Sequence, residues 1–250
     1  MAMRKPILLC TALIAFWGTA AASGEGFVPG GGPGPKILIA YFSRAGENSA
    51  VGRIEKGNTE IVAEMIAERT GGQLFRIETK TPYPEGFAEC AAAAKREKDA
   101  RARPGLRAKV GDIWRYDVIF LGYPIWWGDM PMAVYSFLEG HRFRRAQIVS
   151  SPHEPGAPST RPHRSVRPAA IIPFCTHEGS GLANTVAEIA RVCPKIEVLG
   201  GLAVRGAAAQ SNPDEVAGQV GDWISELDLL QYERGEDVVN RSPFWFSITF

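Results

Sequence analysis

The sequence has few cysteines, almost no net charge and no long apolar run, and each absence excludes a class of protein. Only four of its 250 residues are cysteines, and none forms a Cys-x-x-Cys pair, so neither a disulfide scaffold nor a structural zinc site is expected. The 28 basic and 27 acidic residues give a net charge of +1, which argues against nucleic acid as the main partner. No apolar stretch is long enough to span a bilayer. What remains, with 45% hydrophobic residues and six tryptophans, is a chain able to form a sizeable core.

The first 22 residues have the pattern of a signal peptide. Arg4 and Lys5 precede an apolar stretch over residues 7–17, and small residues follow, with an Ala-x-Ala cleavage pattern that ends at Ala22. We therefore expect Sec-type export to the periplasm or another extracytoplasmic compartment. No stable membrane insertion is expected after cleavage.

The rest of the chain divides by composition. Residues 23–35 form a Gly/Pro-rich linker, residues 36–230 one domain, and residues 231–250 a tail whose role the sequence leaves open. Within the domain, residues 140–170 carry six Arg, five Pro and no Lys, which is typical of a disordered insertion. This basic insertion could modify docking to a partner or have no role.

The domain alternates apolar strands with amphipathic helices. The apolar runs predict strands over 36–42, 73–78, 117–122, 169–174 and 196–204, and helices over 58–69, 87–103, 131–138, 182–192 and from 213 onward. Asn212 is expected to cap the last of these helices. Strands that are apolar throughout are buried on both faces, so we predict an α/β fold with a doubly wound, five-stranded parallel sheet in three layers. Ligands bind such sheets at the carboxyl ends of the strands, which directs attention to three loops.

The loop after the first strand offers an anion site. Residues 43–46 follow the strand, and Asn58 and Thr59 open the first helix, where free backbone N–H groups bind anions. An ordinary capped helix start would look the same. The chain has neither a Gly-x-Gly-x-x-Gly nor a Walker A motif, so dinucleotide and nucleoside-triphosphate sites are not supported.

The other two loops contain aromatic and glycine residues. Trp126 and Trp127 follow the third strand, and a flat aromatic ligand would stack on one of them. Alternatively, one packs into the core and the other covers a helix. In the loop after the fourth strand, His177 is expected to line a pocket rather than bind a metal, and Cys175 to be a buried, inert thiol. No catalytic side chain and no metal site is expected.

These three loops together resemble the flavodoxin family, in the branch with two tryptophans in the second flavin loop. The matching motifs are Tyr-Phe-Ser-Arg at 41–44, Leu-Gly-Tyr-Pro-Ile-Trp-Trp-Gly at 121–128 and Pro-Phe-Cys-Thr-His-Glu-Gly-Ser-Gly at 173–181. The resemblance implies a flavodoxin-like fold that binds FMN at the carboxyl edge of the sheet. The residues that match the family's phosphate loop are Ser43, Arg44, Ala45, Gly46, Asn58 and Thr59. Those that match the two ring loops are Pro124, Ile125, Trp126, Trp127 and Gly128, and Thr176, His177, Glu178, Gly179, Ser180 and Gly181.

The phosphate loop departs from the family, because residues 47–57 intervene between Gly46 and Asn58. Glu47, Asn48 and Ser49 could therefore take part in the phosphate site.

The resemblance implies an FMN-binding electron-transfer protein, in which the flavin carries the chemistry. Its partner would be a redox protein or a small-molecule electron acceptor. Two alternatives remain open: an FMN-dependent NAD(P)H:quinone-type reductase, and a flavodoxin-like binding module that has lost FMN. The sequence has no dedicated nicotinamide motif, which favours the electron carrier over the reductase.

Overall fold

The computed structural model describes residues 34–143, 147–149, 164–166 and 169–229. The expected signal peptide, the C-terminal tail and most of the linker lie outside these residues. Among the helices of the described ranges, none combines the length and hydropathy needed to cross a membrane.

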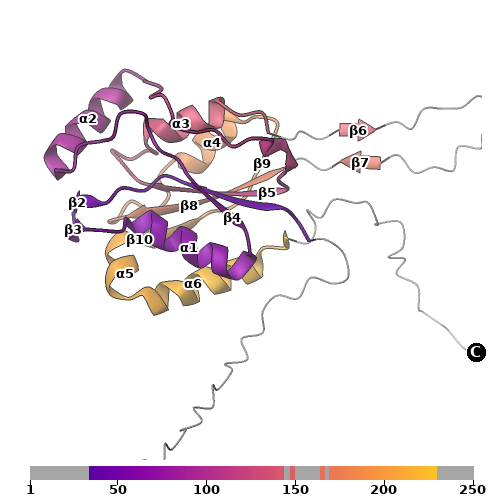
Figure 1. Cartoon of the computed structure of the whole chain (residues 1–250). Coiled ribbons are helices and arrows are strands. Elements are labelled where there is room, and N and C mark those ends of the chain that lie inside the picture. Colours follow the sequence, from indigo (N-terminus) through magenta and orange to yellow (C-terminus); the bar gives the residue numbers. More distant parts are fainter. Residues whose placement is uncertain (1–33, 144–146, 150–163, 167–168, 230–250) are drawn as a thin grey trace, which may run out of the picture.

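The described chain forms three layers around one parallel sheet (Figure 1). The strands follow the order β4-β1-β5-β8-β10, with β9 also paired to β8. Their bounds are β1 Ile37–Tyr41, β4 Gln73–Arg76, β5 Val118–Pro124, β8 Ala170–His177, β9 Glu197–Val198 and β10 Leu202–Arg205. The predicted α/β, doubly wound, three-layer fold is confirmed.

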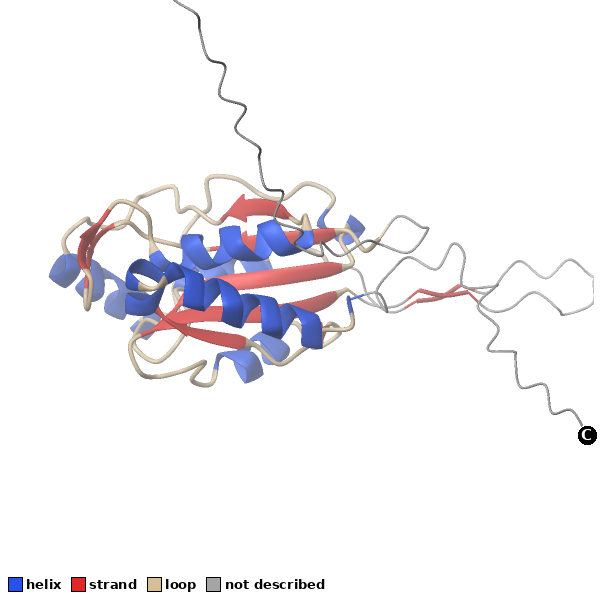
Figure 2. Cartoon of the chain, turned by 90° about the horizontal axis from the view of Figure 1, so that it is seen from below, coloured by secondary structure: helices blue, strands red, loops and turns tan. Residues whose placement is uncertain are grey.

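Helices cover both faces of the sheet. On one face lie α1 Asn58–Thr70, α5 Gly206–Ser211 and α6 Pro213–Glu226, and Figure 2 shows helices of this face lying across the strands. On the other lie α2 Phe87–Asp99, α3 Met132–Glu139 and α4 Thr185–Val192. Side chains of a strand alternate between the faces, so Ile39 packs in the core on the α1 side while Leu38 packs on the α3 side. Both faces of a central strand are therefore apolar.

The predicted fifth strand, 196–204, is wrong as a single element. It is split into β9, which pairs with the start of β8, and β10, which pairs with Phe174 to His177. Pro173 lies in β8 between the two pairings and has no N–H to donate. The chain also comes very close to β8 here, since a Cβ on Gly201 would lie 2.7 Å from the Pro173 carbonyl oxygen. The sheet therefore has six strands, because β9 and β10 both pair with β8 where a single strand was expected.

The helices differ from prediction in places, and α4 begins at Thr185, three residues after the expected Leu182. The second helix ends at Asp99, four residues before the expected Arg103, because Arg101 adopts a left-handed φ of 47° that breaks the helical backbone. The last helix begins at Pro213 as expected, but Asn212 makes no side-chain capping bond. Its Nδ2 instead donates to Glu215 Oε2 over 3.5 Å.

Two short antiparallel strand pairs interrupt the alternation of parallel strands and helices. The first, β2 Gly46–Asn48 with β3 Gly52–Ile54, occupies most of the segment between β1 and α1. The second, β6 Gln147–Val149 with β7 Arg164–Val166, lies within the expected insertion 140–170, most of which is outside the described residues. A short helical turn, Ile113–Arg115, precedes β5.

The topology puts a crevice between β1 and β5. From β1 the chain crosses to β4 on one side and then returns to β5 on the other. The connections therefore leave in opposite directions at the carboxyl ends of β1 and β5, which is the switch point where doubly wound sheets bind ligands.

Candidate functional site

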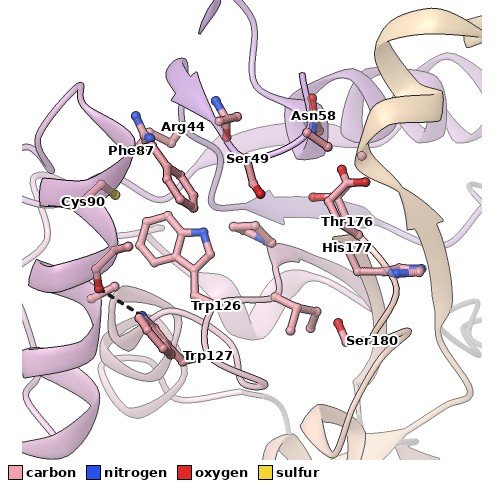
Figure 3. A pocket seen from close by; sticks show the side chains of 18 of the residues that line it. Arg44, Ser49, Asn58, Phe87, Cys90, Trp126, Trp127, Thr176, His177 and Ser180 are labelled. Atoms are coloured by element: carbon pink, nitrogen blue, oxygen red, sulfur yellow. Dashed lines mark hydrogen bonds between the residues drawn. The ribbon is translucent and has the colours of Figure 1, made fainter. Parts of the chain in front are cut away.

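A cavity of about 500 Å³ opens at this switch point. Its walls come from α2 and from the loops after β1, β5 and β8, and in Figure 3 Phe87 and Trp126 lie on one side with Thr176 and His177 on the other. A second cavity of about 30 Å³ adjoins it beside the start of α1. The site therefore has a large compartment and a small one.

The small cavity is polar. Ser43, Thr59 and Thr176 line it, and the Oγ1 atoms of the two threonines lie 2.7 Å apart. Ser43 Oγ accepts a hydrogen bond of 3.1 Å from the backbone N–H of Glu60, in the first turn of α1. The N–H groups of Asn58 and Thr59 have no hydrogen-bond acceptor within the described residues. Free N–H groups at the positive end of a helix dipole suit an anion.

Gly57 makes room for this small cavity. A Cβ at this position would lie 2.2 Å from Ser43 Oγ and 2.6 Å from the carbonyl oxygen of Arg44. No side chain fits between the loop after β1 and the start of α1, so Gly57 allows the two segments to enclose the cavity together.

The two tryptophans lie on a tight turn that closes β5. The backbones of Trp126 and Asp129 exchange two hydrogen bonds, of 2.8 and 3.1 Å. Between them, Trp127 and Gly128 have φ values of 54° and 72°. Positive φ at both central residues is characteristic of a type I′ turn. A bulky residue in this conformation is strained, and such strain gathers at functional sites.

The tryptophan side chains take different places, and both line the cavity. Trp126 packs edge-on against Phe42 and Tyr83, with ring centroids 5.3 and 5.1 Å away. Trp127 is 54% exposed and covers α2, where its Nε1 donates to the Ala91 carbonyl oxygen over 3.0 Å. Trp126 therefore packs against the core and Trp127 covers a helix, as the alternative to ligand stacking expects. Both side chains nevertheless line the cavity.

The loop after β8 forms the opposite wall. His177 Nδ1 accepts a hydrogen bond of 2.8 Å from the N–H of Gly179, which leaves the proton of the neutral ring on Nε2. Burial lowers the pKa of His177, and the nearby charge of Arg205 lowers it further, although Glu178 opposes them. Glu178 Oε1 accepts a hydrogen bond of 2.9 Å from the N–H of Ala207, at the start of α5. The imidazole is therefore neutral at neutral pH, and Glu178 has a structural partner.

Most of the predicted site residues lie around these cavities. Of the seventeen, Ala45, Gly46 and Gly181 line neither cavity, and the other fourteen line one or both. The guanidinium of Arg44 does not point into the small cavity as a free charge, because its Nη1 donates to the carbonyl oxygens of Ala45 and Glu85.

Sequence reasoning missed one wall of the large cavity, the face of α2 made by Phe87, Cys90, Ala91 and Ala94. Their spacing of three, one and three positions is a helical stripe that the sequence displays. The sequence does not show that this stripe faces the cavity, because that depends on where α2 packs in the folded chain. The tip of the first hairpin, residues 48–51, also lines the cavity, and of these residues the sequence indicates only Asn48 and Ser49.

The cysteines of the described residues are unpaired and buried. Burial raises the pKa of Cys175 to about 12 and that of Cys193 to about 11, and it also raises the pKa of Cys90. Thiols with raised pKa values stay protonated and are poor nucleophiles. Nowhere in the described ranges do three metal-ligating side chains gather.

Comparisons with known proteins bear on the family and the fold. A family model described as Flavodoxin matches residues 36–169, more than half of the chain. A search of curated proteins found no match.

Two similar solved structures come from Bacteroides. A candidate flavoprotein from Bacteroides eggerthii is 26% identical, and the match covers 73% of this chain and 98% of that one with a TM-score of 0.50. A candidate flavoprotein from Bacteroides uniformis is 25% identical, with 77% and 99% covered and a TM-score of 0.53.

Proposed function

This chain belongs to the flavodoxin family, and we propose that it binds FMN at the β1–β5 switch point and transfers electrons through that flavin. One observation carries the proposal. A small polar cavity at the start of α1 adjoins a large cavity with an aromatic wall, in the arrangement that a phosphate joined to a flat ring requires.

The small cavity fits the phosphate. The N–H groups of Asn58 and Thr59 would bind its oxygens, together with the hydroxyl groups of Ser43 and Thr176. A dianion is stabilised here by the helix dipole and by short hydrogen bonds rather than by a lysine or arginine.

The large cavity fits the ring. Its volume of about 500 Å³ lies within the range of small-molecule sites, and its walls are mainly apolar, aromatic or glycine-containing. Trp126 and Trp127 would contact the ring from the turn after β5, and the loop Thr176–Ser180 would contact it from the other side. When bound, FMN supplies the redox chemistry.

The chain's own residues would bind, orient and shield the flavin. Backbone hydrogen bonds hold the Trp126–Asp129 turn, and the bond from the Gly179 N–H to His177 Nδ1 holds the loop after β8, so these walls are preorganised. Neutral His177 keeps a proton on Nε2 at the cavity wall without adding charge. No group here needs to act as an acid or a base for electron transfer. The electrons would pass to a redox protein or a small-molecule acceptor.

A visible absorbance spectrum of the purified chain tests the proposal. The protein is mixed with FMN or with riboflavin, and free flavin is removed by gel filtration. We expect retained FMN with quenched fluorescence, and weaker retention of riboflavin, which lacks the phosphate. A folded protein that retains neither flavin would contradict the proposal and identify a binding module without FMN. Steady oxidation of NADPH with a quinone by the FMN-loaded protein would instead identify a reductase.

A further inference from the structure

The side chain of Arg44 is tied to three carbonyl oxygens. Its Nη1 donates to the carbonyl oxygens of Ala45 and Glu85, each over 2.9 Å, and its Nη2 donates to that of Glu47. Ala45 directly precedes β2 and Glu47 lies within it, while Glu85 comes just before α2. The guanidinium therefore joins two segments that lie about forty positions apart in the chain.

Other contacts join the same two segments. The N–H of Glu47 donates to the Glu85 carbonyl oxygen over 3.0 Å, and Glu47 Oε2 accepts from the N–H of Phe87 over 3.2 Å. Arg53 and Glu85 form an ion pair of 2.7 Å, but both side chains are largely exposed. Exposed ion pairs contribute little to stability, so Arg44 and the backbone bonds are the main attachments.

The hairpin that Arg44 holds forms part of the cavity. Its tip, Asn48 to Val51, lines the large compartment, and Asn48 also lines the small one. In Figure 3, Ser49 projects from the hairpin toward the space between Trp126 and Thr176. A ligand that fills both compartments would therefore contact this tip.

We propose that Arg44 is a positioning residue that holds the β2–β3 hairpin over the cavity, so that FMN is retained as a resident group and does not exchange freely. This inference rests on the proposed function. It gives Arg44 a different role from the phosphate contact that the family resemblance implies. The guanidinium acts through the hairpin, and the phosphate is left to hydroxyl and backbone N–H groups.

The rates at which flavin leaves the protein test the proposal in three variants. Arg44→Gln removes the hydrogen bonds from the guanidinium to the three carbonyl oxygens, and it removes one positive charge. Arg44→Lys keeps the charge but cannot reach three carbonyl oxygens at once. Arg53→Gln removes a positive charge from the same hairpin without touching the cavity, and it is the matched control. Release of FMN and of riboflavin is followed by the recovery of flavin fluorescence after dilution.

We expect Arg44→Gln and Arg44→Lys to speed the release of both flavins by a similar factor, about tenfold, as the loss of charge-assisted hydrogen bonds predicts. Arg53→Gln should change either rate by less than about twofold. The proposal is overturned if Arg44→Gln speeds the release of FMN but not of riboflavin, because Arg44 would then act on the phosphate. It is also overturned if Arg44→Lys behaves like the wild type.

Hydrogen exchange without flavin provides an independent measurement. In Arg44→Gln, backbone amides of residues 46–54 should exchange faster while those of α1 keep their rates. Unchanged exchange rates in the hairpin would contradict the proposal that Arg44 holds it in place. If the wild type retains neither flavin, the proposed function fails and no resident group exists, whereas the exchange result still decides whether Arg44 holds the hairpin.

Discussion

The hydroxyl oxygens of Thr59 and Thr176 lie 2.7 Å apart in a buried contact that joins the start of α1 to the end of β8. The two residues are 117 positions apart in the chain, and both line the small polar cavity. One hydrogen bond therefore links the stability of the fold to the geometry of the proposed phosphate site.

Replacing Thr176 with Val should lower both the stability of the fold and the affinity for FMN. The substitution leaves the buried hydroxyl of Thr59 without this partner, so the free energy of unfolding should fall by about 1–3 kcal/mol. FMN affinity should fall more than riboflavin affinity, because only FMN has the phosphate. Urea denaturation and fluorescence titration measure the two effects, and Thr176→Ser is the control that keeps the hydroxyl. Wild-type affinity for FMN in Thr176→Val would contradict the assignment of this cavity.

A methyl group at Gly57 should distort the small cavity. The Cβ of Gly57→Ala would lie 2.2 Å from Ser43 Oγ, so the loop after β1 must move away from α1. We expect FMN affinity to fall at least about tenfold together with a lower melting temperature. Gly218→Ala is the matched control. Gly218 lies in the exposed face of α6 with no atom near its Cβ, and alanine there should stabilise the helix by up to about 1 kcal/mol.

Alanine variants of three tryptophans should distinguish a role in packing from a role in binding. Trp127→Ala should weaken FMN binding roughly threefold to tenfold, because an aromatic contact is lost. Trp114→Ala should leave the affinity unchanged, since Trp114 is similarly exposed, at 49%, but lies outside the cavity. Trp126→Ala should also lower the free energy of unfolding, by at least about 2 kcal/mol, because Trp126 packs on other rings. Fluorescence titration and denaturation distinguish the three, and equal affinities for the first two variants would count against ring contact.

His141 should make stability depend on pH. Its Nε2 accepts a hydrogen bond of 3.1 Å from the N–H of Val110, and its Nδ1 donates to the Phe137 carbonyl oxygen over 2.7 Å, so the ring is neutral. Burial lowers the pKa of His141 and the charge of Lys109 lowers it further, although the bond to Phe137 opposes them.

Because the folded pKa is below the unfolded value of about 6.5, the unfolded chain binds the extra proton first as the pH falls. Stability should therefore be lost below about pH 6.5, with a slope of at most about 1.4 kcal/mol per pH unit for this one proton. Urea denaturation between about pH 7 and pH 5 should show a shallower loss in His141→Gln than in the wild type. Parallel pH profiles for the two proteins would show that His141 is not responsible.

The central strands and the three ligand loops were predictable because their signals are local. The apolar runs around Ile39, Phe120 and Ile172 are continuous, and helices separate them in the chain. Such runs are buried on both faces, which leads to a parallel sheet and places the following loops at one edge. The fifth strand was not predictable in the same way. Its break opposite Pro173 depends on which strand lies beside it, and a residue pattern within 196–204 does not contain that information.

The sequence by itself determined the order of the central strands and of the helices between them, the family and the three loops at the carboxyl edge of the sheet, since periodicity, apolar runs and loop motifs are properties of neighbouring residues. Only the tertiary structure decided what individual side chains do there. It placed the α2 stripe against the cavity, turned Arg44 toward the Glu85 carbonyl oxygen and brought Thr59 to Thr176. These contacts join residues tens of positions apart, so they depend on how the backbone packs rather than on any local pattern.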